Sequence, residues 1–170
     1  MCPRCGYEWQ ASPNNRSKGV GCPCCSGRVP KVGVNDLKTV RPDLAEEWNY
    51  EKNNELRPEN FLPKSGKKVW WKCKSCGHEW ESTIQKRSNG LSCPCCDGRI
   101  VVLGKNDLKT VRPDLAEEWN YEKNGDLKPE QVFYKSDKRV WWVCKICGHV
   151  WCTTINHRYY GTGCPKYYEH

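Results

Sequence analysis

The chain has 170 residues, a formal net charge of +8 and a mean hydropathy of −0.88. No stretch is long and apolar enough to cross a membrane, and no apolar signal region follows Met1, so we expect an intracellular protein, cytoplasmic or, in a eukaryote, nuclear. Cys (14) and Trp (9) are frequent whereas Leu, Ile, Val and Phe are sparse, which predicts small modules that depend on a metal for much of their stability.

Cysteines recur every 71 residues along the chain. Each copy has a C-x2-C pair followed, after 16 intervening residues, by a third cysteine, and in two copies a fourth cysteine completes a second C-x2-C pair. The sets are Cys2, Cys5, Cys22 and Cys25; Cys73, Cys76, Cys93 and Cys96; and Cys144, Cys147 and Cys164. This spacing suits tetrahedral Zn2+ better than a disulfide framework. We therefore predict zinc as the cofactor, with two four-cysteine sites and a third, incomplete one.

The repeat predicts five segments in chain order. They are a zinc module over 1–29, a helical connector over 30–66, a second module over 67–100, a second connector over 101–137 and a third module over 138–170. The first module lacks the Val-Trp-Trp run that precedes the cysteine pair in the other two, and the last stops before its helix. Either the chain is a piece of a longer repeat protein, or a partner completes its ends.

The middle copy carries the clearest local pattern. Residues 68–73 (KVWWKC) and 79–84 (EWESTI) are rich in Trp and β-branched residues and flank the turn C-K-S-C-G-H, which predicts a β-hairpin closed by a zinc knuckle. Adjacent strand residues face opposite sides, so one of Trp70 and Trp71 is expected in the core and the other partly exposed. A loop containing Arg87, the second knuckle and a short β-like run over 99–103 complete the module.

The connectors are nearly identical, with 22 of 27 residues matching between 32–58 and 103–129. In the second connector, Asn106 or Asp107 is expected to cap a first helical turn, and Pro113 to open a second that runs to Trp119. Leu108, Val111, Leu115 and Trp119 fall on one side of this region and are expected in the core. The fold class is therefore small zinc-stabilised α+β repeats, in which β-hairpin modules are joined by short helices.

Comparison of the copies identifies cysteines and histidines that are dispensable. Cys24 and Cys95 lie inside C-P-C-C, but Lys166 stands at that position in the third copy, so we interpret both as non-ligands. His78 and His149 follow the knuckle glycine, where the first copy has Tyr7. We therefore interpret these histidines as packing or hydrogen-bonding residues.

The third site lacks a fourth cysteine because Tyr167 stands in its place. The candidates for a fourth ligand are His170, His157, Cys152 or no residue, and His170 is favoured because chain ends move freely. An open position resembles catalytic zinc, but no general acid, base and nucleophile set accompanies it, so we predict a truncated structural site and not an enzyme.

The composite pattern N-D-L...P-D-L-A-E-E-W-N...P, followed by V-W-W-x-C-x-x-C-G-H-x-W...R-x-x-G-x-x-C-P, resembles the "probable zinc-ribbon domain" family over nearly the whole chain. The resemblance implies tandem zinc-ribbon or treble-clef-like modules, often attached to restriction-endonuclease-like or other DNA-associated domains. It therefore implies zinc and a nucleic-acid partner. Tyr167 departs from the pattern.

Basic residues recur with the repeat. Arg16, Arg87 and Arg158 each lie six positions before the third cysteine, where they would suit phosphate recognition along a polymer or, alternatively, packing on Trp inside each module. Lys67 and Lys68 adjoin the middle hairpin, as Lys138 and Arg139 adjoin the last. Interleaved with Trp, these cations predict a positive groove for nucleic acid, with the glutamates at 46, 47, 117 and 118 facing away.

Net charge alone is weak evidence for this partner, because two four-thiolate zinc sites, each about −2, reduce the total to roughly +4. The arrangement of the cations and the resemblance predict a zinc-dependent nucleic-acid-binding repeat module, with DNA favoured over RNA, accessory to a nuclease or other nucleic-acid machinery. The alternative is a protein-interaction scaffold within a larger assembly.

Overall fold

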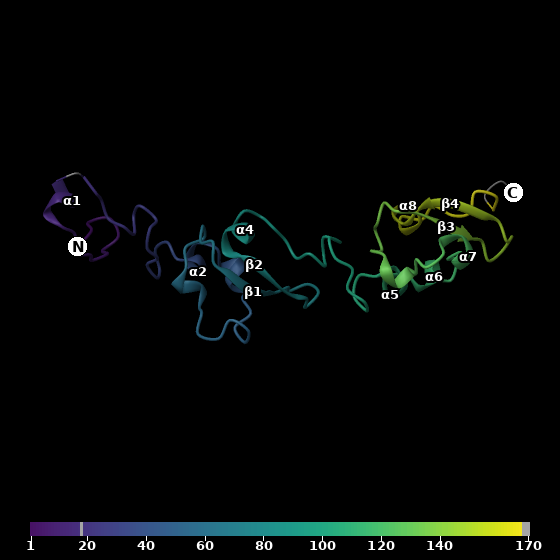
Figure 1. The fold of residues 1–170 in the computed structure, drawn as a ribbon, viewed down its shortest axis with the longest axis horizontal. Coiled ribbons are helices and arrows are strands. Elements are labelled where there is room, and N and C mark those ends of the chain that lie inside the picture. The colour runs from purple at the N-terminus through teal and green to yellow at the C-terminus, as the bar shows by residue number, and fades with distance from the viewer. Residues whose placement is uncertain (18, 168–170) are drawn as a thin grey trace. The chain divides into compact units, whose positions relative to one another are not determined.

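The computed structural model describes residues 1–17 and 19–167. Contacts divide the chain into two compact units, Met1–Ser92 and Cys93–His170. The first contains α1 (Pro13–Ser17), α2 (Leu37–Val40), α3 (Pro42–Ala45), the 3-10 helix η1 (Pro58–Asn60), β1 (Lys68–Lys72), β2 (Glu79–Thr83) and α4 (Ile84–Ser88). The second contains α5 (Leu108–Val111), α6 (Pro113–Ala116), α7 (Tyr121–Asn124), the 3-10 helix η2 (Pro129–Gln131), β3 (Arg139–Val143), β4 (Val150–Thr154) and α8 (Ile155–Tyr159) (Figure 1).

Each unit is built on one antiparallel hairpin, β1–β2 or β3–β4. The register places Trp71 opposite Trp80 and Trp142 opposite Trp151. Trp71 and Trp142 are fully buried. Their neighbours Trp70 and Trp141 are half-buried, so the expected alternation of the tryptophan pairs is confirmed.

The first helical turn of each connector begins where the sequence predicts. In unit 2, Asp107 is the N-cap of α5 and accepts a hydrogen bond from the Thr110 N–H at 2.9 Å. Arg112 then leaves helical geometry, at φ −137° and ψ 70°, because the ring of Pro113 restricts the preceding residue. The region is thus two single turns, α5 and α6. This break changes which side chains face inward.

Three members of the expected apolar stripe, Leu108, Leu115 and Trp119, are buried. Val111 is only half-buried, so its assignment to the core was wrong, and the equivalent Val40 is 49% exposed. The reason is geometric, since the interruption at Arg112 breaks the helical period on which the stripe was counted.

The core of unit 2 joins the connector to the hairpin. It comprises Leu108, Leu115, Trp119, Val132, Val140, Trp142 and Ile155. Trp119 and Trp142 meet edge to face, with ring centroids 5.6 Å apart. The indole N–H of Trp119 donates to the Leu127 carbonyl at 3.1 Å, and that of Trp142 donates to the Thr153 carbonyl at 3.2 Å. Both indoles therefore bury large apolar surfaces without leaving a polar group unsatisfied.

Two local expectations were wrong. Residues 99–103, all described by the structure, contain no strand. Arg87 lies in α4 and not in a loop, because Thr83 caps a short helix directly after β2 and accepts a hydrogen bond from the Lys86 N–H at 3.3 Å. Among the described residues, none of the helices is long and apolar enough to span a membrane.

Candidate metal centres and basic surface

Three knuckles with the same backbone pattern position the first cysteine pair of each copy. The glycine after the second cysteine donates its N–H to the carbonyl of the first cysteine, at 2.8 Å for Gly6 and 2.9 Å for Gly77 and Gly148. All three glycines have positive φ, between 64° and 69°, which is readily available only to glycine. This tight reversal turns both sulfurs of a pair toward the same point.

The second cysteine pair approaches each knuckle to complete a sulfur cluster. In the first cluster, Cys2 Sγ lies 3.6 Å from Cys25 Sγ, Cys5 Sγ lies 3.6 Å from Cys22 Sγ, and Cys25 Sγ lies 3.5 Å from Cys5 Sγ. A zinc ion with Zn–S bonds of about 2.3 Å requires sulfurs about 3.8 Å apart at the corners of a tetrahedron. A disulfide would require about 2.05 Å. The cluster therefore fits Zn2+ and not a disulfide.

The sulfurs of Cys73, Cys76, Cys93 and Cys96 form an equivalent group, all within 4.8 Å of one another. The donor set is again four thiols in two C-x2-C pairs. Both four-cysteine groups thus carry the ligands predicted from the sequence, and zinc bound there would act as a structural cross-link with a filled coordination shell.

Electrostatics within the first cluster favour a bound cation. The backbone N–H groups of Cys5 and Arg4 lower the pKa of Cys2 to about 6, because they stabilise its thiolate. Hydrogen bonds to the neighbouring sulfurs of Cys5 and Cys2 raise the pKa of Cys25 to about 12, because they stabilise its protonated thiol. Four thiolates therefore require a compensating positive charge, and Zn2+ supplies it when bound.

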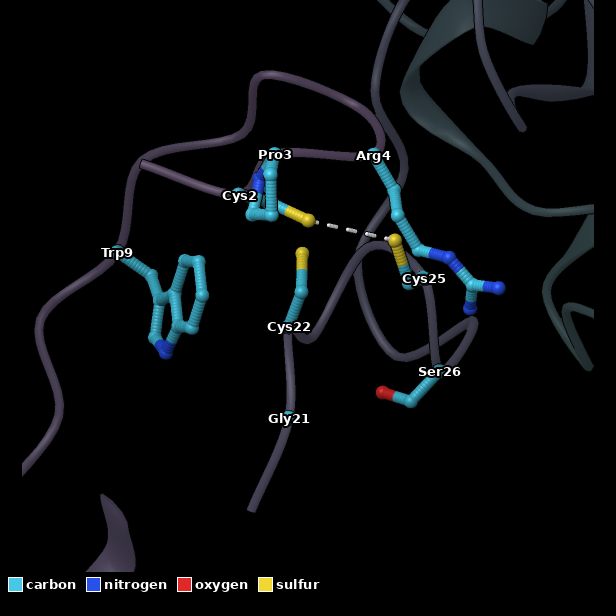
Figure 2. Close-up of a pocket in the computed structure, with 8 residues that line it drawn as sticks. All are labelled: Cys2, Pro3, Arg4, Trp9, Gly21, Cys22, Cys25 and Ser26. Carbon is cyan, nitrogen blue, oxygen red and sulfur yellow. Dashed lines mark hydrogen bonds between the residues drawn. The ribbon is translucent and has the colours of Figure 1, made fainter. Parts of the chain in front are cut away.

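Figure 2 shows the sulfurs of Cys2, Cys22 and Cys25 directed toward one another, with the Trp9 ring beside Cys22 and the Arg4 side chain extending past Cys25. These residues line a surface hollow of about 440 Å³. It contains no general acid or base placed against the sulfurs, within the part of the chain that the structure describes.

The third cluster contains the sulfurs of Cys144, Cys147 and Cys164 only, among residues 1–17 and 19–167. Cys147 Sγ and Cys164 Sγ are 3.7 Å apart, which again matches a tetrahedral edge. Cys152 lies on β4 opposite Trp141, and His157 Nδ1 lies 3.5 Å from the Thr153 hydroxyl. Neither belongs to the cluster, and His170 falls outside the described residues. The third site therefore offers Zn2+ three thiolates from the described chain.

The profile of the probable treble clef zinc finger domain family matches residues 1–28, 44–99 and 115–166, most of the chain. The chain belongs to this family. The match and the three clusters together confirm the zinc-binding fold that the resemblance implied.

The chain is also similar to the uncharacterized protein R635 of Acanthamoeba polyphaga mimivirus, with 26% identity over 92 residues. The alignment covers 51% of this chain and 20% of the relative, so this chain matches only about a fifth of the relative's length.

Within these zinc modules, Cys24 and Cys95 join the second cysteine pair to the connector through their backbone carbonyls. Cys24 and Cys95 are buried, and neither belongs to a four-sulfur group. Their carbonyls accept hydrogen bonds from the side-chain amides of Asn35, at 2.9 Å, and Asn106, at 2.7 Å. Sequence reasoning missed this anchoring role of the asparagines, for which the identical N-D-L run in both connectors was the available signal.

The knuckle histidines lie against tryptophan. His78 stacks on Trp80 with ring centroids 6.3 Å apart, and His149 stacks on Trp151 at 6.1 Å. This is the packing role expected from Tyr7 in the first copy, and neither histidine is part of a cysteine group.

Two of the repeated arginines are buried. Arg87 and Arg158 are each 6% exposed. Arg158 pairs with the Glu118 carboxylate and donates to the Thr162 carbonyl at 2.7 Å, while its guanidinium lies 5.3 Å from the Trp142 ring and 5.1 Å from the Trp151 ring. Arg87 makes the same set of contacts with Glu47, Leu91, Trp71 and Trp80.

Each of these guanidinium groups has its partners within its own unit. This arrangement corresponds to the packing alternative left open by the sequence, and it takes Arg87 and Arg158 away from any surface that a phosphate could reach. The structure does not describe the Arg16 side chain.

The basic residues beside the hairpins are exposed. They are Lys67 and Lys68 in unit 1 and Lys138 and Arg139 in unit 2. Lys68 pairs with Glu81 at 2.7 Å. Position 152, which is equivalent to 81, is a cysteine, and Arg139 donates to the Cys152 carbonyl at 3.2 Å. In the described chain, no ion pair involves Lys67, Lys138 or Arg139.

The glutamates that we expect to face away from a bound nucleic acid pair with cations of the same unit. Glu46 pairs with Lys74 and Glu117 with Lys145, in addition to the arginine pairs of Glu47 and Glu118. These pairs form because the connector packs against the hairpin, which brings Glu46 and Glu117 beside Lys74 and Lys145.

Proposed function

We propose that the chain is a zinc-stabilised module that binds nucleic acid, with DNA favoured over RNA, and that it serves a larger nucleic-acid machinery. The observation that carries the proposal is the repeated set of exposed cations, Lys67 and Lys68 beside one hairpin and Lys138 and Arg139 beside the other. Cations presented at matching places on successive modules suit a polymer that carries one negative charge per nucleotide.

In this proposal the zinc ions have a structural role. Bound zinc would fix the conformation of each knuckle and of the β-hairpin that the knuckle closes. The hairpin in turn keeps its neighbouring cations exposed at the surface. Because phosphate contacts release counterions, affinity is expected to fall steeply as salt rises, with a slope of about −0.9 per phosphate contact on duplex DNA.

The test is a salt-graded binding measurement of the zinc-loaded chain on a DNA duplex and on an RNA of equal length. Replacing Lys67, Lys138 and Arg139 together by Ala is expected to weaken binding and to reduce the salt slope by about 1 per lost contact. Lys109→Ala is the matched control, because Lys109 is an exposed cation already paired with Glu130 at 2.7 Å. Binding that ignores both salt and the triple substitution would overturn the proposal.

A second candidate function is a protein-interaction scaffold. The supporting observation is that apolar side chains are exposed at matching positions of the two connectors: Val32 at 68% and Leu103 at 72%, and Tyr50 at 47% and Tyr121 at 55%. Exposed apolar residues that recur with the repeat suit a partner protein. A protein complex that survives high salt and is lost on Leu103→Ser, with no nucleic-acid binding by the intact chain, would favour this second function.

A further inference from the structure

Unit 2 carries a row of aromatic rings on its surface. Tyr134 lies between η2 and β3, whereas Tyr159 ends α8 and Tyr160 follows it. The ring centroids of Tyr134 and Tyr159 are 5.0 Å apart, and those of Tyr159 and Tyr160 are 5.1 Å apart. The row continues inward to Phe133, whose centroid is 4.6 Å from that of Tyr134. Two segments distant in sequence thus build one aromatic surface.

The outer end of this row is open to solvent. Tyr160 is 70% exposed, while Tyr134 and Tyr159 are half-buried. The inner rings therefore support the outer one, so that Tyr160 presents a large planar surface on a fixed base. The Tyr160 ring contributes little to the core, because most of its apolar surface remains in water.

Positive charge lies directly over the rings. Lys135 Nζ is 5.0 Å from the Tyr159 ring centroid, 5.3 Å from that of Tyr134 and 5.8 Å from that of Tyr160. The segment that follows runs along α8, because Ser136 and Lys138 accept backbone hydrogen bonds from Asn156, at 2.9 Å, and Ile155, at 3.1 Å. The exposed Lys138 therefore lies beside Ile155, the first residue of α8, and Tyr159 is the last residue of that helix.

This combination selects the chemistry of the ligand. A cationic ligand such as a methylated ammonium group would meet an aromatic cluster already occupied by the Lys135 ammonium. A nucleic acid can contact both the lysines and the tyrosines favourably, because its phosphates pair with lysine and its bases stack on tyrosine. In a duplex, the faces of the bases are already stacked on each other, so only unpaired bases can use the tyrosines.

The other unit supplies an internal comparison. It keeps both lysines, as Lys64 and Lys67, but has Pro63, Ser88 and Asn89 where unit 2 has the three tyrosines. The same hairpin and helix form in both units, so the fold does not need the tyrosines. Their presence in one unit only is consistent with a function in binding.

We propose that Tyr134, Tyr159 and Tyr160, together with Lys135 and Lys138, form a site that stacks unpaired nucleobases and gives the chain a preference for single-stranded nucleic acid. The inference rests on the proposed nucleic-acid-binding function and assigns the class of ligand to one face of unit 2. Tyr160 is the outermost stacking ring, and the two lysines hold the adjoining phosphates.

The experiment compares the zinc-loaded full chain and the variant Tyr159→Ser/Tyr160→Asn, which installs the residues of unit 1. The probes are fluorescein-labelled oligothymidylate and a DNA duplex of equal length, measured by anisotropy at fixed salt. Stacking on a protein aromatic ring predicts a loss of at least about 5-fold in affinity for oligothymidylate, with duplex affinity changed by less than about 2-fold. The exposed Tyr121→Ser variant is the control and is expected to keep both affinities.

Single substitutions separate stacking from a folding defect. Tyr160→Asn alters an exposed side chain and is expected to lose affinity for oligothymidylate, whereas Tyr160→Phe keeps the ring and is expected to retain it. Equal binding of oligothymidylate by the wild type and by both asparagine variants overturns this inference while leaving the proposed function intact. Failure of the wild type to bind either probe overturns the proposed function itself.

Discussion

Replacing Arg158 is expected to lower the stability of unit 2 without changing the salt slope of nucleic-acid binding. Arg158→Met keeps a long apolar side chain against the tryptophans but removes the ion pair with Glu118 and the hydrogen bond to the Thr162 carbonyl. Loss of one partner of a buried ion pair costs about 3–5 kcal/mol. Because the Glu118 side chain is 24% exposed, water recovers part of this cost, and we expect about 2–3 kcal/mol.

Amide hydrogen exchange followed by mass spectrometry measures this change region by region. A loss of about 2–3 kcal/mol corresponds to roughly 30- to 150-fold faster exchange, since each 1.4 kcal/mol is tenfold. Peptides from β3, β4 and α8 are expected to accelerate, while peptides from β1 and β2 act as a reference within the same molecule. Arg139→Met, which changes an exposed side chain, is expected to shift exchange by less than about 0.5 kcal/mol.

The reasoning is refuted if Arg158→Met leaves exchange of unit 2 unchanged and lowers the salt slope of nucleic-acid binding by about 1. That result would mean that the guanidinium contacts phosphate and that the pair with Glu118 contributes little. A double-mutant cycle with Glu118→Gln measures the coupling directly, because the second substitution should cost much less once Arg158 is absent.

Three further predictions concern the metal sites. Tyr167→Cys supplies a fourth thiolate to the three-cysteine cluster and is expected to add one tightly held zinc per chain, measured by elemental analysis after dialysis against a weak chelator. Cys96→Ala is expected to release zinc from the second site under the same conditions, whereas Cys95→Ala, which removes a thiol outside the cluster, is expected to retain it. Zinc binding at pH 7 should release the proton of Cys25, whose pKa is about 12, so zinc affinity is expected to fall already as the pH drops through 7. The fall should become steeper below about 6, the pKa of Cys2, because protons then compete for its thiolate as well. Calorimetry in buffers of different ionisation enthalpy measures that release, and none would contradict the assigned protonation states.

Local rules predicted the elements whose signals are local. The Trp-rich strands, the Asp107 cap and the glycine turns at the knuckles each depend on a few neighbouring residues, and the structure contains them. Val111 was misassigned because its burial depends on a break at Pro113 that shifts the helical period. Residues 99–103 lack a strand because a β-like composition forms a strand only when another strand pairs with it.

The burial and the partners of the charged residues depend on tertiary contacts and could not be predicted from local sequence. Arg87 and Glu47 lie 40 residues apart in the sequence, so no short window reveals that they form a buried ion pair. The tyrosine row of unit 2 was missed for the same reason. Tyr134 and Tyr159 are brought within stacking distance only when the segment before β3 packs along α8.

By itself, the sequence determined the 71-residue repeat, the cysteines of two four-sulfur clusters and those of the three-sulfur cluster, because ligand spacing within a knuckle is a short-range geometric requirement. Only the tertiary structure decided which cations are available to a partner. Burial of a charge depends on whether a carboxylate and aromatic rings from other segments surround it. Packing encloses Arg87 and Arg158 in this way and leaves Lys67, Lys138 and Arg139 at the surface.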